Sequence, residues 1–272
     1  MSRADPLAVD NRYGSSGIIS AVAFLLALGF FSWSLIRAGF SFTELWEGLP
    51  NMAVIAGEMV PPATDRMLPM LDSILVTFQM AFVGTVIGVL ISFPLALLAA
   101  HNTSPHPLIA SSVKGMISFF RTVPDLAWAL FFVASVGLGP FAGTLTLMID
   151  TIGFCGRFFA EAIEETDPGP SDALAAIGVH PIDRIVVATL PDALPGMTAS
   201  GLFALEKAVR SSVVLGLVGA GGIGAELAVS MEMFRYDQAA TIILMIFVLV
   251  IAVEKLSNAA RNGLRMLRKQ NV

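Results

Sequence analysis

Long apolar runs without a charged residue alternate with short polar segments along this chain of 272 residues. Ile18 to Ile36 is one such run, Ser73 to Ala100 is a second, and Thr241 to Val253 is the uncharged centre of a third. About 20 mostly apolar residues are enough for a helix to cross a bilayer. The pattern therefore predicts a protein that crosses the membrane several times.

Turn signals and prolines between the apolar runs set the limits of the expected spans. We predict membrane helices over residues 17–37, 72–100, 109–136, 141–162, from Pro191 or Pro195 to Leu215, and 239–256. Two glycines and a proline at 137–140 disfavour a continuous helix. We therefore prefer two spans in this region over one long span from Leu126 to Ile149.

The same pattern divides the chain into five parts. We expect a cytoplasmic N-terminal arm at 1–16, a first transmembrane helix at 17–37, an extracytoplasmic or interfacial segment at 38–71, a core permease-like domain at 72–257 with a cytoplasmic loop at 161–191, and a basic cytoplasmic tail at 258–272. In the interfacial segment, Leu45, Trp46 and Leu49 recur at helical spacing. Tryptophan favours the membrane interface, and Pro61 with Pro62 ends this helix.

Basic residues after the last span set the expected orientation. They are Lys255, Arg261, Arg265, Arg268 and Lys269. Positive residues near span ends mark the cytoplasmic side. With six spans, both termini and the 161–191 loop lie in the cytoplasm, and the glycine-rich stretch near residue 220 faces outward.

Composition supports a membrane protein and excludes some kinds of site. Only 14% of the residues are charged, against about 25% in a typical soluble domain. The single cysteine, Cys155, excludes an internal disulfide and a cysteine-built metal site, and the three histidines have no metal-ligand spacing. We expect no metal, no nucleic-acid partner and no cofactor bound by this chain.

The stretch from Val213 to Leu227 contains a glycine pattern that resembles a dinucleotide-binding fingerprint. Gly219, Gly221 and Gly224 match G-x-G-x-x-G, with Gly222 beside them. A dinucleotide fold needs further strand–helix alternation, whereas this chain continues into an apolar span. We predict instead that the four glycines form an outer gate loop, where irregular backbone is tolerated if protein buries it or it lines a cavity.

The loop at 161–191 contains a short, alanine-rich segment, "SDALAAIG". Asp167 or Ser171 can cap its start, and Gly178 can end it in the left-handed conformation. A helix of two turns is unstable alone in water. We therefore expect it to bind a partner surface, although an ordinary cytoplasmic loop has the same composition.

This segment resembles a signature of the inner-membrane permeases of ABC importers: E-A-A, three residues, G, nine residues, then I-x-L-P. The corresponding residues are Asp172, Ala173, Leu174, Gly178, Leu190 and Pro191, with Ala175 in the same helix. Asp172, Leu174 and Ala188 depart from the signature, but its spacing is intact. With "RTVPDLAWAL" and "VGLVGAGGIG", the chain from about 70 to 260 is similar to phosphonate importer permeases.

The resemblance implies an all-α integral membrane protein with about six transmembrane helices, in the type I (MetI-like) importer permease architecture. It implies a homodimer in a bacterial cytoplasmic membrane, with two cytoplasmic ABC ATPase subunits and an extracytoplasmic phosphonate-binding protein. The seven signature residues would form the coupling helix and its exit. ATP and magnesium would bind in the ATPase, since this chain lacks the P-loop pattern and is expected to be no enzyme.

Charged residues inside predicted spans are costly and mark candidate functional sites. They are Arg121, Asp125, Asp150, Arg157, Glu206, Lys207 and Arg210. Glu206 and Arg210 are four residues apart and can pair, which leaves Lys207 as spare positive charge. Lys207 and Arg210 would line an anion path near the outer mouth, or else reach the interface or pair between helices. For Arg121 we expect a structural ion pair.

Two other functions fit parts of the sequence. An ion-coupled secondary transporter would use Asp150 as its coupling carboxylate, but this leaves the alanine-rich loop unexplained. A membrane-bound oxidoreductase would use the glycine stretch, but the surrounding strands are missing. The permease of an ATP-driven importer of phosphonate or a related phosphorus oxyanion accounts for more of the chain.

Overall fold

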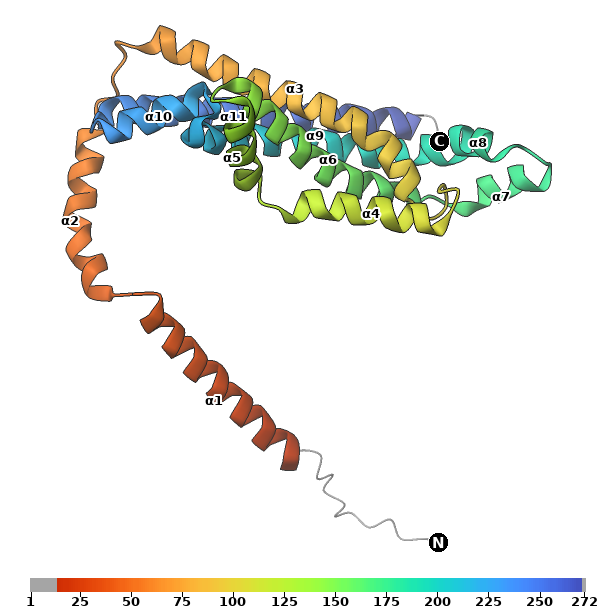
Figure 1. Ribbon diagram of the computed structural model, residues 1–272, viewed down its shortest axis with the longest axis horizontal. Helices are drawn as coiled ribbons and strands as arrows, with labels where there is room; N and C mark the ends of the chain where they lie inside the picture. Colours follow the sequence, from red (N-terminus) through yellow and green to blue (C-terminus); the bar gives the residue numbers. More distant parts are fainter. Residues whose placement is uncertain (1–13, 271–272) are drawn as a thin grey trace. The chain divides into compact units, whose positions relative to one another are not determined.

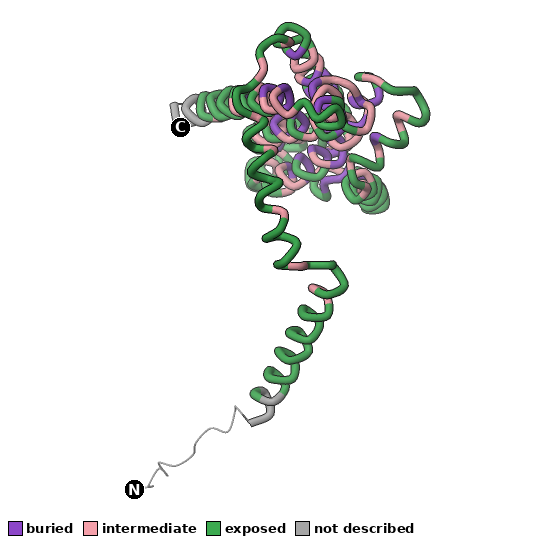
Figure 2. Tube along the Cα trace, turned by 90° about the vertical axis from the view of Figure 1, so that its left-hand side faces the viewer, coloured by how far each residue is buried: buried purple, intermediate pink, exposed green. Residues whose placement is uncertain are grey.

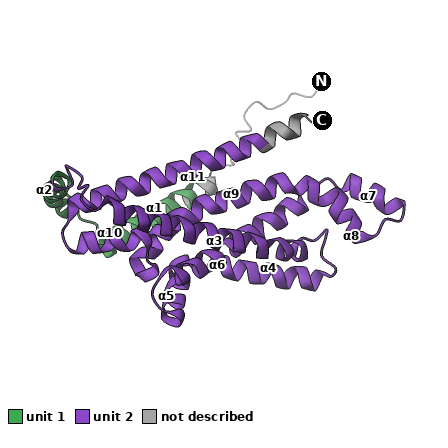
Figure 3. Cartoon of the chain, turned by 90° about the horizontal axis from the view of Figure 1, so that it is seen from above, with its two compact units in different colours: residues 1–57 green, residues 58–272 purple. Residues whose placement is uncertain are grey.

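The computed structural model describes residues 14–270, and every regular element in that range is a helix (Figure 1). The chain divides into two compact units, residues 1–57 and 58–272 (Figure 3). Most of the predicted N-terminal arm and the last two residues of the predicted tail lie outside the described residues. The two units are described separately below.

The first unit contains α1 (Gly14–Arg37) and nearly all of α2 (Phe42–Glu58). The residues of α1 from 19 to 37 are long and apolar enough to cross a membrane, and none is buried within this chain (Figure 2). Large side chains such as Leu26 and Phe30 are more than 60% exposed. Because water disfavours such a surface, α1 requires lipid or protein around it. This fits the predicted first span.

Within residues 58–270, which the structure describes, the second unit contains nine α-helices. They are α3 (Met67–Ala99), α4 (Pro107–Thr122), α5 (Asp125–Val136), α6 (Pro140–Glu164), α7 (Pro168–Ala176), α8 (Pro181–Arg184), α9 (Leu190–Leu215), α10 (Gly222–Glu232) and α11 (Tyr236–Gln270), with π-helical turns η1 at Ile185–Thr189 and η2 at Gly216–Ala220. Residues 258–270, predicted as a tail, continue α11 as helix. The helices α7 and α8 lie at one end of the unit, and α10 lies at the other (Figures 1 and 3).

Two pairs of helices are bent at a short break. The predicted span over 109–136 is not one continuous helix, because α4 and α5 meet at an angle of 86°. Val123, which precedes Pro124, is extended, as expected for a residue whose helical conformation clashes with the proline ring. At the second break, the continuous helical stretch 181–220, which runs from α8 to η2, meets α10 at an angle of 61°. By length and composition, the described residues contain three apolar spans, or up to five if each bent pair counts as one, against the six predicted. The helix α6, which matches the predicted span at 141–162, is not among the five.

The preference for two helices around residue 138 is confirmed, and the single span from Leu126 to Ile149 is wrong. Gly137 and Gly139 have φ angles of 95° and 132°, which side chains rarely adopt. Pro140 then begins α6, where its missing N–H costs nothing. The turn therefore follows directly from the local sequence.

The centre of the second unit is the close contact between α3 and α6. A Cβ atom added at Gly88 would lie 2.6 Å from Cβ of Thr151, and one added at Gly84 would lie 2.9 Å from Cβ of Leu147. Small residues at such positions let helix backbones approach in the membrane. The buried residues gather in the interior of the unit (Figure 2). Many of them belong to α3 and α6, so these two helices form the base on which the other helices pack.

Gly88→Ala should lower the free energy of unfolding by about 1–3 kcal/mol, the usual cost of overpacking. Thermal unfolding of the purified protein in detergent measures this. Gly115→Ala in α4 is the matched control, since nothing lies within 4 Å of an added Cβ there and both changes gain helix propensity. Equal midpoints for the two variants would contradict the close contact.

Candidate functional site

The segment that resembles the importer signature forms α7, α8 and η1 at one end of the second unit (Figure 1). The Gly169 N–H donates to the Asp167 carboxylate over 2.9 Å, so of the two candidates Asp167 is the residue that caps α7. The helix ends at Ala176, and Gly178 follows with φ of 82°. The predicted start and end of this short helix are therefore confirmed.

This segment has little contact with the rest of the chain. None of the residues of α7 is buried. Of the predicted coupling residues, Asp172, Ala173, Ala175, Gly178 and Pro191 are exposed, and Leu174 and Leu190 are half-buried. Ile177 and Ile182, which the sequence analysis did not single out, are 77% and 63% exposed. The segment thus presents an apolar surface that fits a docking partner.

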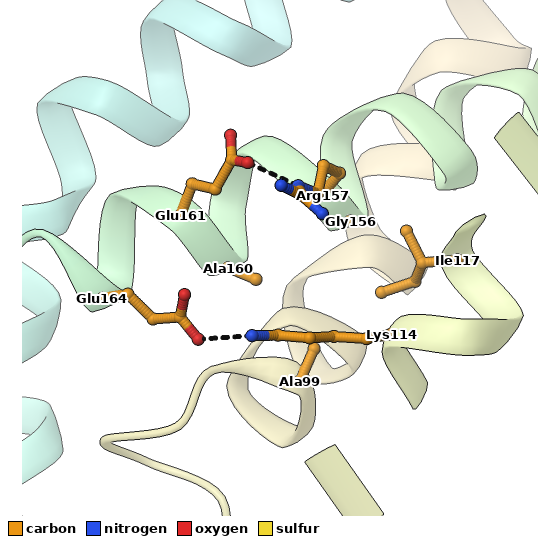
Figure 4. Close-up of a pocket in the computed structure, with 8 residues that line it drawn as sticks. All are labelled: Ala99, Lys114, Ile117, Gly156, Arg157, Ala160, Glu161 and Glu164. Carbon is orange, nitrogen blue, oxygen red and sulfur yellow. Dashed lines mark hydrogen bonds and ion pairs between the residues drawn. The ribbon is translucent and has the colours of Figure 1, made fainter. Parts of the chain in front are cut away.

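A network of charged groups joins α3, α4 and α6 at the same end of the unit. Lys114 from α4 points at Glu164 of α6, with Arg157 and Glu161 beside them (Figure 4). The Lys114 ammonium donates to Oε1 of Glu164 over 2.8 Å, and the His101 N–H donates to the same oxygen over 2.9 Å. The ring Nδ1 of His101 lies 2.5 Å from it.

The network holds the end of α6 in place just before the loop that leads to α7. The Asn102 side chain adds a hydrogen bond to the carbonyl of Ile163 over 2.7 Å, so the loop after α3 contacts α6 twice. The cavity in Figure 4 measures about 50 Å³ and has space for only a few water molecules. These charges therefore form a structural network and not a cargo site.

Opposing effects act on the Glu164 carboxyl. Burial raises its pKa, but the hydrogen bond from Lys114 and those from His101 lower it by more, so the pKa lies below its ordinary value. A lowered pKa means that folding favours the charged carboxylate. The resulting stability is present at neutral pH and is lost as pH falls through the lowered pKa.

The charged residues within the spans pair differently from the prediction. Lys207 of α9 donates to both carboxylate oxygens of Asp150 in α6, over 2.6 and 2.9 Å, so Lys207 is not spare. The expected pair of Glu206 with Arg210 is also wrong. Glu206 is buried and accepts from Arg261 of α11 over 2.6 Å, because α9 turns Glu206 inward while Arg210 faces outward, exposed.

Three further charged residues lie at the surface of the unit. Arg157 pairs with Glu161, four residues later on α6. Asp125 accepts from the N–H of Leu126 at the start of α5. The ion pair expected for Arg121 is absent from the part of the chain that the structure describes: Arg121 is exposed at the end of α4, where its backbone packs against Gly153.

The glycine stretch lies at the end opposite α7. Gly219, Gly221 and Gly222 have φ angles between 71° and 97°, and Gly224 packs against the carbonyl of Val213, which an added Cβ would approach to 2.0 Å. The N–H of Ile223 donates to Oγ1 of Thr77 over 2.8 Å, and the Gly139 N–H donates to the Gly219 carbonyl over 2.9 Å. The loop therefore joins α3 to the turn before α6.

The described residues contain no group of three His, Cys, Asp or Glu side chains placed to hold a metal ion. Geometry thus draws attention to three features: the exposed segment at α7 and α8, the network around Glu164, and the ion pair of Asp150 with Lys207. The segment at α7 and α8 was predicted from the sequence. The ion pair of Asp150 with Lys207 was not predicted, because its partners are far apart in the sequence. Opposite charges in two predicted spans are nevertheless a signal for such a pair.

Glu164→Gln should lower the free energy of unfolding by about 1 kcal/mol at neutral pH, because it removes the charge held by Lys114 in a partly exposed network. The difference from the unchanged protein should shrink as pH falls and Glu164 becomes protonated. Thermal unfolding in detergent at several pH values measures both effects. Glu165→Gln, at an exposed neighbour, is the control and should change neither. A difference that grows toward acidic pH would contradict the network.

Known proteins similar to this chain are transport components. The family described as "binding-protein-dependent transport system inner membrane component" matches residues 92–261. The phosphite transport system permease protein of Stutzerimonas stutzeri is 38% identical over 219 residues, which cover 80% of each chain. The phosphate-import permease protein of Mycolicibacterium smegmatis is 37% identical over 273 residues, covering 97% of this chain and 48% of that protein. This chain thus spans about half the length of the mycobacterial relative.

Solved structures show the same fold. A chain of the inward-facing methionine ABC transporter matches with a TM-score of 0.66 and 22% identity, over 74% of this chain and 99% of its own. A chain of an amino acid ABC transporter matches with a TM-score of 0.62 and 18% identity, over 73% and 95%. The predicted all-α importer-permease fold is therefore confirmed. Because the family match covers more than half of the sequence, this chain belongs to the family of binding-protein-dependent transport system inner membrane components.

Proposed function

We propose that this protein is the membrane-spanning permease subunit of an ATP-driven importer for phosphonate or a related phosphorus oxyanion. The observation that carries the proposal is the exposed coupling segment at α7–α8, in a chain of this family. The relatives named for phosphite and phosphate transport support the class of cargo. The rival ion-coupled transporter explains neither the segment nor the family match.

The assembly we propose contains two copies of this chain, two cytoplasmic ABC ATPase subunits and an extracytoplasmic phosphonate-binding protein. ATP and magnesium bind in the ATPase subunits, and this chain hydrolyses nothing itself. The apolar side chains of Ile177 and Ile182 support a protein partner at the coupling segment. The match covers 48% of the mycobacterial relative, so the rest of that protein is long enough for a second unit of similar length. This supports an assembly with two copies of this chain.

In the orientation we propose, α7 and α8 face the cytoplasm and the glycine loop faces outward. Closure of the ATPase subunits moves α7, which leads directly into α6 on one side and through η1 into α9 on the other. The network around Glu164 holds the end of α6, so the movement passes into the spans. The outer end then opens to receive the anion, which passes inward after hydrolysis.

Ala173→Asp should remove most of the ATPase stimulation that the loaded binding protein produces, at least tenfold, because it adds a charge to the apolar docking surface. Reconstitution of the permease with its ATPase and binding protein in liposomes measures this. Ala259→Asp makes the same change at an exposed position of α11, within the predicted cytoplasmic tail, and should leave stimulation within twofold. Uptake driven by a proton gradient without the ATPase would overturn the permease proposal.

We also propose that the loop of Gly219, Gly221, Gly222 and Gly224 forms part of the outer gate. An alanine at residue 222 would bring its Cβ to 2.4 Å from Oγ1 of Thr77 and would keep a φ of 71° that favours glycine. Gly222→Ala should therefore lower ATP-dependent uptake by about tenfold. Gly137→Ala is the control, because its φ of 95° gives comparable strain but nothing lies within 4 Å. Equal uptake in the two variants would contradict the gate.

A further inference from the structure

The pair of Asp150 and Lys207 lies near the middle of α6, which we take to cross the membrane, as the sequence predicts for residues 141–162. Asp150 is the eleventh residue of the 25-residue α6, so at 1.5 Å per residue it lies about 15 Å from one end of that helix and about 21 Å from the other. The hydrocarbon core of a bilayer is about 30 Å thick. The pair therefore lies where a charge facing lipid is most costly.

The pair nevertheless reaches the surface of the single chain. The side chain of Lys207 is 37% exposed and that of Asp150 is 16% exposed. A lysine side chain with this exposure in a membrane span does not direct its ammonium into hydrocarbon, because intramembrane charges face protein or a water-filled cavity. The surface that carries the pair thus faces the interior of the assembled transporter.

Other charges continue the same surface, which we name the α6–α9 stripe. It consists of Asp150, Phe154, Arg157, Phe158 and Glu161 on α6, and Phe203, Lys207 and Arg210 on α9. These residues recur at intervals of three and four, so each set shares one face of its helix. The Lys207 ammonium lies 5.6 Å from the ring centre of Phe154, which stacks on Phe203 at 5.6 Å.

The stripe has an excess of positive charge. Lys207 is neutralised by Asp150, and Arg157 by Glu161. Arg210 has no ion-pair partner within the described ranges, and it lies three residues, or about 4.5 Å along the axis, beyond Lys207 toward the glycine loop. An anion that enters from that end therefore meets Arg210 first and Lys207 next.

We propose that Lys207 is an exchangeable binding site for the tetrahedral phosphorus oxyanion, and that Asp150 is a built-in competitor which occupies Lys207 when no cargo is present. This inference rests on the proposed function. The ammonium has three donors, two of which bond Asp150 here. The oxyanion takes those donors as it passes, and its negative charge replaces that of the carboxylate beside Lys207.

Competition by Asp150 explains how the site releases its cargo. While the oxyanion holds Lys207, the carboxylate of Asp150 is left without its partner in a largely buried position, which is unfavourable. Return of Lys207 to Asp150 removes that penalty and expels the anion. The affinity of the site for the anion is therefore low, which a translocation path requires if the cargo is to leave it. A purely structural ion pair between α6 and α9 would need no such exchange.

Three variants separate exchange from a structural role: Lys207→Gln, Asp150→Asn, and the double variant. The permease is reconstituted with its ATPase and binding protein in liposomes, and uptake of methylphosphonate, phosphite and phosphate is measured per ATP hydrolysed, together with the thermal midpoint. Lys255→Gln makes the same chemical change at an exposed position of α11, outside the stripe. We expect it to keep the thermal midpoint and to keep uptake per ATP within twofold.

Exchange predicts that Lys207→Gln lowers uptake per ATP by about tenfold or more. In Asp150→Asn the anion has no competitor, so internal methylphosphonate should inhibit uptake at about tenfold lower concentration. The double variant should regain the thermal midpoint, because a neutral pair needs no partner charge, but should not regain uptake. Recovery of both by the double variant would mean a structural pair and would overturn the inference.

The outcomes also separate this inference from the proposed function. If the unchanged transporter imports none of the three oxyanions with ATP, the proposed function is wrong, and the inference is wrong with it. If the unchanged transporter imports one of them and Lys207→Gln imports it equally well per ATP, the proposed function holds and only the exchangeable site is wrong.

Discussion

The close approach of α3 and α6 is the constraint on which the rest of the second unit depends. Gly84 and Gly88 carry no side chain, so Leu147 and Thr151 of α6 pack directly against the backbone of α3. Asp150 and Phe154 follow Leu147 and Thr151 by three residues, so they lie at the edge of this contact and meet α9 there. The same contact places Glu164 at the end of α6 beside Lys114. Packing of small residues thus decides where the charged residues face.

Two kinds of ion interaction lie in different parts of the second unit. At the α7 end, Glu164 is held by Lys114 and by the loop after α3, and these bonds make α6 a firm connection to the exposed helix α7. Near the middle of α6, Asp150 pairs with Lys207 alone, and the Lys207 ammonium lies over the ring of Phe154. The first arrangement resists movement because several bonds must break together. The second depends on one pair, and a competing anion can open it.

Local signals in the sequence predicted local structure well. Gly137, Gly139 and Pro140 ended one helix and began another, and Asp167 with Gly178 defined the short helix α7. The sequence analysis missed relations between distant residues. The helix bend at Pro124 was read as a continuous span, although the proline was a sufficient signal. Gly84-x-x-x-Gly88 was a readable signal for close helix packing. No local pattern shows that Lys207 meets Asp150 and that Glu206 meets Arg261, because both pairs depend on how whole helices are placed.

Neighbouring residues of α9 pair in opposite directions, Glu206 with α11 and Lys207 with α6. Successive residues on a helix point about 100° apart, so the two bonds together fix the rotation of α9 about its own axis. While both hold, α9 is joined by ion pairs to α6 and to α11 at once. An anion that separates Lys207 from Asp150 removes the ion pair with α6 and leaves the one between Glu206 and Arg261 of α11. The cargo itself would then determine which movement the helices can make.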